Sequence, residues 1–143
     1  MFVKQLSVFV ENKPGGMAPI IEALGKNDIN ISALSLADTS EYGILRLITA
    51  DTDKAAKVLK DFGVVVKVTD VLVVAIDDTP GGLSKILDIF VAASVNVDYM
   101  YAFVGSVTNK ALMVVKVSDA QLAADALKNA GIHTEEAKNI YRL

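Results

Sequence analysis

The sequence reads Lys13-Pro14-Gly15-Gly16-Met17 near its beginning and Thr79-Pro80-Gly81-Gly82-Leu83 near its middle. The offset between the two segments is 66 residues, measured from Pro14 to Pro80. Farther along, Ile29-Asn30-Ile31 is matched by Val95-Asn96-Val97 at the same offset. Similar segments that recur at a fixed spacing indicate a duplicated structural unit. The chain is therefore predicted to consist of two copies of one small module.

A third pair of matching segments sets the length of each copy. Leu59–Val64 resembles Leu127–Ile132, and here the offset is 68 residues. The difference of two residues requires an insertion between these landmarks. We expect it in the Gly105–Lys110 segment, which has the character of a hairpin tip. The predicted domains are residues 1–69 and residues 70–143.

Apolar residues recur at helical spacing in four stretches, two in each copy. Asp51-Thr52-Asp53 and Ser118-Asp119 precede the second stretch of each copy and supply residues that can cap the first helical turn. Gly63 and Gly131 follow these stretches and are typical of helix ends. The four predicted helices cover Met17–Leu24, Ala55–Phe62, Leu83–Phe90 and Ala123–Ala130.

Apolar and β-branched runs lie between the helices, and Thr39–Glu41 and Ser106–Asn109 are predicted hairpin turns. Each copy then has the order β-α-β-β-α-β, which builds a four-stranded antiparallel sheet with two helices on one face. The predicted fold class is α+β, with two ferredoxin-like βαββαβ modules. The predicted strands are Val3–Glu11, Asn30–Ala37, Tyr42–Thr49, Val64–Thr69, Val71–Asp77, Asn96–Val104, Ala111–Val117 and His133–Ala137.

Composition and charge disfavour several classes of function. Hydrophobic residues make up 52% of the chain, but the longest apolar run, Val71–Ile76, has the length of a strand rather than a membrane span. The formal net charge is −3 and basic residues form no stripe, which disfavours nucleic-acid and membrane binding. Met1–Gln5 lacks signal-peptide features and the chain has no cysteine, so we expect a cytoplasmic protein without disulfides.

The apolar content also bears on assembly. Each copy, at about 70 residues, can bury only a modest core by itself. The surplus of apolar side chains is explained by strands buried on both faces or by a subunit interface. We therefore expect a homo-oligomer, with a dimer as its simplest form.

Both Pro-Gly-Gly segments stand between a predicted strand and a predicted helix. A helix N-terminus exposes N–H groups that attract an anion such as a carboxylate, and glycine lets a ligand approach the backbone. The residue two positions before each proline differs between the copies, since Asn12 in the first corresponds to Asp78 in the second. Beside a carboxylate site, such a side chain suits the ammonium group of a zwitterion. The alternatives are a plain strand-to-helix turn and a helix cap.

Catalytic machinery is not suggested by the sequence. The single histidine, His133, is far in sequence from both glycine turns. No spacing of histidine and acidic residues is typical of a metal site, and there is no phosphate-binding loop of the Walker type. We expect no enzyme activity, no cofactor and no metal.

The segments Glu11–Met17 with Ile29–Ile31, and Asp78–Leu83 with Val95–Val97, resemble the ACT domain. The resemblance covers nearly the whole chain as two modules. It implies side-by-side sheets, with ligands at the junction of two modules. Some members of this family carry a histidine two residues before the loop asparagine, where this chain has Val10 and Ile76.

ACT modules commonly hold a ligand between the first loop of one module and the start of the second strand of the other. Carried over to this chain, the resemblance places Asn12 opposite Asn96, and Asp78 opposite Asn30. The implied ligand-binding residues are Asn12, Pro14, Gly15, Gly16, Met17 and Asn30 in the first copy, and Asp78, Pro80, Gly81, Gly82, Leu83 and Asn96 in the second.

The leading hypothesis is a non-catalytic regulatory protein that binds an amino acid at the interface between ACT modules. The expected partners are this small ligand, a second copy of the chain and an unidentified enzyme. The alternatives are an assembly module without a ligand and a small enzyme of similar topology. The Lys138–Leu143 segment aligns with Asp70–Ala75, and is either an additional strand or a frayed terminus.

Overall fold

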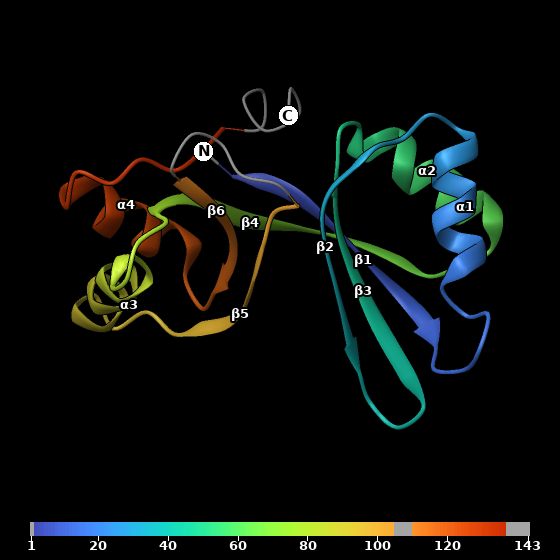
Figure 1. Cartoon of the computed structure of the whole chain (residues 1–143), viewed down its shortest axis with the longest axis horizontal. Helices are drawn as coiled ribbons and strands as arrows, with labels where there is room; N and C mark the ends of the chain where they lie inside the picture. Colours follow the sequence, from blue (N-terminus) through green and yellow to red (C-terminus); the bar gives the residue numbers. More distant parts are fainter. Residues whose placement is uncertain (1, 105–109, 137–143) are drawn as a thin grey trace. The chain divides into compact units, whose positions relative to one another are not determined.

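The computed structural model describes residues 2–104 and 110–136, in which strands and helices alternate as two similar sets (Figure 1). The strands are β1 (Val3–Glu11), β2 (Ile31–Asp38), β3 (Tyr42–Thr49), β4 (Val66–Asp77), β5 (Val97–Ala102) and β6 (Lys110–Val117). The helices are α1 (Ala18–Lys26), α2 (Thr52–Phe62), α3 (Gly82–Ala92) and α4 (Ala120–Asn129).

The first module is the compact unit Lys4–Thr69. Its strands follow the order β2-β3-β1, and the chain entering β4 lies beside β1, where the Phe9 N–H donates to the Val65 carbonyl at 3.2 Å. The helices α1 and α2 pack against each other on one side of this sheet (Figure 1). The core between helices and sheet includes Leu6, Val8, Ile20, Leu24, Leu45, Leu47 and Leu59.

The second module comprises residues 70–136 together with Phe2 and Val3 among the described residues. Its strands follow the order β4-β6-β5, and an isolated antiparallel bridge joins Thr134 to Val74. The helices α3 and α4 lie together on one side of these strands (Figure 1). The core includes Leu72, Val74, Ile86, Phe90, Val115 and Leu127, and Phe2 packs against it.

The predicted fold class is confirmed, because both modules have the ferredoxin-like plan of an antiparallel sheet with two helices on one face. Both predicted capping segments are also confirmed, with Asp51 and Asp119 as the residues that cap α2 and α4. The Asp51 carboxylate accepts from the Lys54 N–H, and the Asp119 carboxylate accepts from the Leu122 N–H, each at 3.0 Å. Gly63 ends α2 in a left-handed conformation with φ of 98°, as glycine permits.

Three predicted strands differ from the structure. Val64–Thr69 and Val71–Asp77 were expected as separate strands, but Val66–Asp77 forms the single strand β4, since no glycine or proline separates the two runs. The predicted strand His133–Ala137 is wrong in extent, because only the bridge at Thr134 forms among its described residues. The polar residues Thr134 and Glu135 offer no apolar alternation that a sheet face could bury.

The register of the two modules locates the insertion. Leu36 pairs with Leu45 in the first module, and Ala102 pairs with Met113 in the second. The offset therefore changes from 66 to 68 residues after Ala102 and before Lys110, in agreement with the sequence prediction. The hairpin tip Ser106–Asn109 and the tail Lys138–Leu143 lie outside the described residues.

Thr49 is a buried position at which the two modules differ in polarity. Its side-chain hydroxyl is buried and has no hydrogen-bond partner among the described residues, and the residue itself is only 1% exposed. The equivalent residue of the second module is Val117, which pairs with Val97 as Thr49 pairs with Ile31. A buried hydroxyl without a partner costs about 1–3 kcal/mol.

We expect Thr49→Val to leave the free energy of unfolding unchanged or to raise it by up to about 1 kcal/mol, because the desolvation penalty of the hydroxyl disappears. Urea denaturation monitored by circular dichroism measures the change. Thr39→Val is the matched control, since the Thr39 hydroxyl accepts from the Tyr42 N–H and its loss is unfavourable. A loss of more than about 1 kcal/mol for Thr49→Val would contradict this view of the buried hydroxyl.

Candidate functional site

The turns between β1 and α1 and between β4 and α3 depend on glycine at two positions each. Gly15 and Gly81 have φ of 77° and 86°, a left-handed region that side chains other than glycine rarely adopt. A Cβ atom on Gly16 would lie 2.3 Å from the Glu11 carbonyl oxygen, and one on Gly82 would lie 2.1 Å from that of Asp77. In each turn, the first glycine is therefore required for its backbone angle and the second for its close packing.

Each turn presents backbone N–H groups that have no acceptor within the described part of the protein. In the first module they belong to Gly15, Met17 and Ala18. In the second module the equivalent groups of Gly81, Leu83 and Ser84 are likewise without acceptors among the described residues. The intervening glycine is satisfied in both copies, because Gly16 and Gly82 donate to Lys13 and Thr79 at 3.1 Å and 3.0 Å.

The helices α1 and α3, which follow the two glycine turns, also lack the side-chain caps seen at α2 and α4. The N-cap residues of α1 and α3 are Met17 and Gly81, and neither makes a side-chain cap hydrogen bond. The interpretation of Asn12 or Asp78 as a helix cap is therefore wrong. Backbone N–H groups that lack an acceptor at a helix N-terminus are available to an anion.

The two helices begin at different points of their turns. In α3 the Lys85 N–H donates to the Gly81 carbonyl at 3.3 Å, which starts the helix at Gly82. The equivalent of Lys85 in the first module is Pro19, which has no N–H to donate. The first helix consequently begins two residues later in the alignment, at Ala18.

Asn12 and Asp78 are exposed but differ in their contacts. The Asn12 N–H donates to the Glu41 carbonyl, and its side-chain amide donates to the Thr39 carbonyl, both at 3.2 Å. Asn12 thus links the glycine turn to the β2–β3 hairpin, a role that sequence reasoning missed because its partners Thr39 and Glu41 are 27 and 29 residues away. The Asp78 carboxylate makes no hydrogen bond or ion pair with any described residue.

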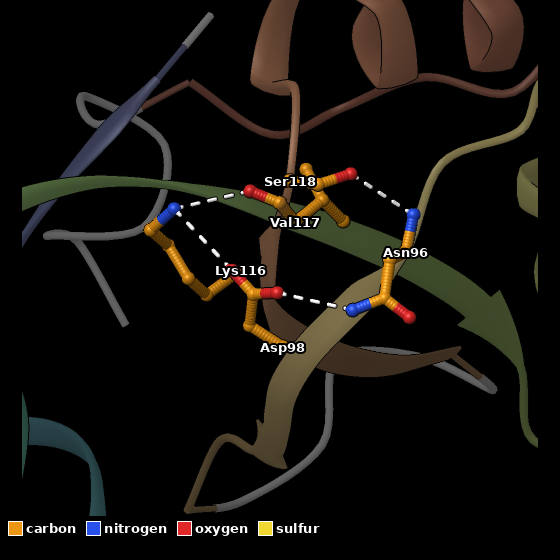
Figure 2. A network of polar contacts seen from close by, with 5 residues as sticks. All are labelled: Asn96, Asp98, Lys116, Val117 and Ser118. Atoms are coloured by element: carbon orange, nitrogen blue, oxygen red, sulfur yellow. Dashed lines mark hydrogen bonds and ion pairs between the residues drawn. The ribbon is translucent and has the colours of Figure 1, made fainter.

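Asn96 belongs to a polar network at the start of β5 (Figure 2). Its N–H donates to the Ser118 hydroxyl at 3.0 Å, and its side-chain amide donates to the Asp98 carboxylate at 3.2 Å. The Lys116 ammonium lies 3.8 Å from that carboxylate and donates to the Val117 carbonyl at 3.0 Å. The Asn96 amide is therefore held in a fixed orientation by a charged neighbour.

Asn30 is the equivalent residue of the first module. Its carbonyl accepts from the Ala50 N–H at 3.4 Å, and its side chain makes no hydrogen bond to the described residues. Each asparagine is followed by the same irregularity, since the strand register shifts between Ile31 and Ala33 and between Val97 and Tyr99. A β-bulge changes the direction of nearby side chains and is common beside binding sites.

Within one module, the glycine turn and the asparagine lie at opposite ends of the sheet. Glu11, at the end of β1, pairs with Tyr42 at the start of β3, whereas Asn30 contacts Ala50 beyond the end of β3. The second module repeats this, with Asp77 opposite Lys110 and Asn96 beside Ser118. A single module therefore does not bring its own glycine turn and its own asparagine together.

Each turn is preceded by a carboxylate that pairs with a lysine. The Lys13 ammonium lies 2.7 Å from the Glu11 carboxylate, and its hydrogen bond and charge lower the pKa of Glu11. In the second module the Lys110 ammonium donates to Asp77 from the neighbouring strand, and this hydrogen bond and charge lower the pKa of Asp77. The positive charge of Lys85 acts on the Asp77 pKa in the same direction.

Two structural features were also assessed in the described residues. None of the described helices combines the length and the apolar character that a membrane span requires. No cluster of three or more histidine or acidic residues within residues 2–104 and 110–136 could hold a metal ion.

The family model described as an ACT domain pair matches residues 1–143. The crystal structure of protein BT0572 from Bacteroides thetaiotaomicron is 39% identical, with a TM-score of 0.93, over 100% of this chain and 98% of that chain. The ligand-free regulatory subunit of aspartate kinase from Thermus thermophilus has a TM-score of 0.62 at 15% identity, over 89% and 91% of the two chains. No match is found among curated proteins.

The fold also occurs within a longer enzyme chain. Aspartate kinase from Synechocystis has a TM-score of 0.59 at 19% identity, covering 96% of this chain but 28% of that chain. At this level of identity the likeness concerns the fold of the matched part. The duplicated architecture is therefore shared by proteins of quite different length.

Proposed function

Because the chain belongs to the family of ACT domain pairs, we propose that it is a regulatory protein that binds an amino acid and does not catalyse a reaction. The observation that carries the proposal is the repeated set of backbone N–H groups without acceptors in the described chain, at Gly15, Met17 and Ala18 and again at Gly81, Leu83 and Ser84. A carboxylate satisfies such groups by accepting charge-assisted hydrogen bonds.

In the proposed complex, the carboxylate of the amino acid binds one glycine turn, and the start of the second strand of another module supplies the remaining contacts. Following the resemblance to ACT modules, Asn12 would act with Asn96, and Asp78 with Asn30. The Asp78 carboxylate suits the ligand ammonium, because no described residue neutralises its charge. The two sites are unequal, since Asn12 is already committed to the β2–β3 hairpin.

The binding energy required is modest. A sensor for a metabolite at micromolar to millimolar concentration needs about −4 to −8 kcal/mol of binding free energy. A few charge-assisted hydrogen bonds of about 1.5–3 kcal/mol each and some buried apolar area supply this amount. The ligand would act by favouring one arrangement of subunits or partners over another.

The comparisons support the regulatory part of the proposal. Regulatory subunits of aspartate kinase share the fold, which makes the architecture compatible with regulation by a small ligand. The proposal also keeps the homo-oligomer, the cytoplasmic location and the unidentified partner enzyme that the sequence predicts.

A thermal-shift screen over the common amino acids tests the proposal. At a concentration of about 100 times Kd, the ligand is expected to add about 2.7 kcal/mol to the stability of the folded protein. For a chain of this length, the midpoint Tm rises by roughly 5–10 °C. Gly15→Val and Gly81→Val should remove the shift at their own turns, because a branched side chain is strained at these φ values.

A second variant distinguishes a lost binding site from misfolding as the reason for a lost Tm shift. Asp78→Ala removes a side chain without described partners, so the unliganded Tm should change little while the ligand-induced shift falls. Asp61→Ala, on the exposed surface of α2, is the matched control and should retain the full shift. If no amino acid raises the Tm of the intact chain, the sensor is rejected in favour of an assembly module without a ligand.

A further inference from the structure

Each module contains a cleft of its own beside the glycine turn. The first cleft has a volume of about 390 Å³ and lies between the end of β1, the start of α1 and the segment after α2. The second has a volume of about 340 Å³ and lies between the end of β4, the start of α3 and the segment after α4. Volumes in this range suit a small ligand. The two clefts occupy equivalent positions, because Gly16 and Gly63 line one and Gly82 and Gly131 line the other.

The chemistry of the two clefts has diverged. The first is lined by Phe9 and Phe62, about half exposed at 47% and 49%, and also by the ion pair of Glu11 and Lys13. In the second, the equivalent of Pro19 is Lys85 and the equivalent of Val65 is His133, and both of these line the cleft. The second cleft therefore has the polar side chains of Lys85 and His133 where the first has the apolar residues Pro19 and Val65.

The second cleft contains one ion pair and two further residues of opposite charge, Lys85 and Glu135, that are not paired with each other. Lys110 is paired with Asp77, so these two residues cancel locally. Lys85 and Glu135 line the same cavity but form no ion pair together among the described contacts. The Glu135 backbone N–H donates to the Val73 carbonyl at 2.8 Å, which fixes the segment that carries this carboxylate.

From this arrangement we infer that the cleft of the second module is a separate binding site for a zwitterionic amino acid, whose carboxylate pairs with Lys85 and whose ammonium pairs with Glu135. Opposite charges within one small cavity bind a zwitterion better than a simple anion or cation, since either of those would leave one charge unmatched. The inference rests on the proposed function for the class of ligand, but its residues come from one module and are not those implied by the ACT resemblance, apart from Gly82.

The site gives the chain a binding step that does not depend on the pairing of modules. Lys85 comes from α3, Asp77 from β4, Lys110 from β6, and Glu135 from the segment after α4. His133 lies at the rim and adds a donor or acceptor according to its protonation. In the first module Pro19 stands in place of Lys85, and Lys67, the equivalent of Glu135, does not line the cleft, so this cleft serves as an internal comparison.

An NMR titration of the intact chain with the common L-amino acids tests the inference. The amides of Lys85, Ile132 and Glu135 should shift saturably, whereas those of Phe9 and Gly63 should not. Lys85→Gln and Glu135→Gln should each raise the Kd for these shifts at least tenfold, because each loses one charge-assisted contact. The corresponding amine without a carboxylate, and the acid without an ammonium, should bind at least tenfold more weakly than the amino acid.

The matched controls are Lys57→Gln on the exposed face of α2 and Lys67→Gln, which occupies the position equivalent to Glu135 in the first module. Both should keep the Kd of the unmodified chain. The double exchange Lys85→Glu with Glu135→Lys should recover most of the affinity that either single change loses.

The outcomes separate this inference from the proposed function. Shifts confined to Gly81, Leu83 and Ser84 would leave the proposed sensor intact and overturn the intramodular site. Saturable shifts in the cleft that persist unchanged in both charge-removing variants would also overturn it. An absence of shifts at every amide would reject both proposals together.

Discussion

Replacing Gly82 with alanine is expected to lower the free energy of unfolding by about 2 kcal/mol or more, through strain at a position where nothing flexible can yield. The added Cβ would lie 2.1 Å from the Asp77 carbonyl oxygen and 3.1 Å from its carbonyl carbon, both backbone atoms. Relief requires a shift of the turn between β4 and α3. Gly16→Ala should act in the same direction, because its Cβ would lie 2.3 Å from the Glu11 carbonyl oxygen.

Gly25→Ala is the matched control for these substitutions. A Cβ at Gly25 would meet no atom within 4 Å, and the residue lies inside α1. Alanine at such a site stabilises a helix by about 0.5–1 kcal/mol relative to glycine. Urea denaturation of the three variants measures the differences. If Gly25→Ala and Gly82→Ala changed the free energy of unfolding equally, close packing at the turn would not be the cause of the destabilisation.

Phe90→Ala should cost about 3–5 kcal/mol, which is the largest effect expected from a single core substitution here. Phe90 is 1% exposed in the core of the second module and is the largest of the fully buried side chains. Removal of the ring leaves a cavity lined by rigidly packed neighbours, so the lost transfer free energy and the cavity cost add together.

The neighbouring residue provides the control for this prediction. Val91 follows Phe90 on α3 but is 76% exposed. Val91→Ala should change the free energy of unfolding by no more than about 0.5 kcal/mol. Thermal and urea unfolding give both values. A loss below about 1 kcal/mol for Phe90→Ala would show that the core of the second module contributes little to stability.

Local features of the fold could be predicted from sequence because their causes lie within a few residues. Asp51 and Asp119 cap helices through the N–H three residues on, and such contacts follow from residue type and position. The glycine turns were recognised from their repetition, and their positive φ values agree. The helical spacing of apolar residues likewise identified all four helices.

Features that depend on distant residues could not be predicted in this way. The continuity of β4 was missed, since its two halves belong to different modules and each resembles a complete strand. The commitment of Asn12 to Thr39 depends on where the β2–β3 hairpin folds back. The charged cleft combines Lys85, Lys110 and Glu135 from separate segments, and sequence spacing does not reveal that they line one cavity.

An amide-detected NMR titration with the amino acid that gives the largest thermal shift shows whether the backbone amides of the two turns bind the ligand. Saturable changes are expected at Gly15, Met17 and Ala18, at Gly81, Leu83 and Ser84, or at both sets, with the same Kd as the thermal stabilisation. Saturable binding that leaves all six of these amide signals unchanged would contradict this expectation.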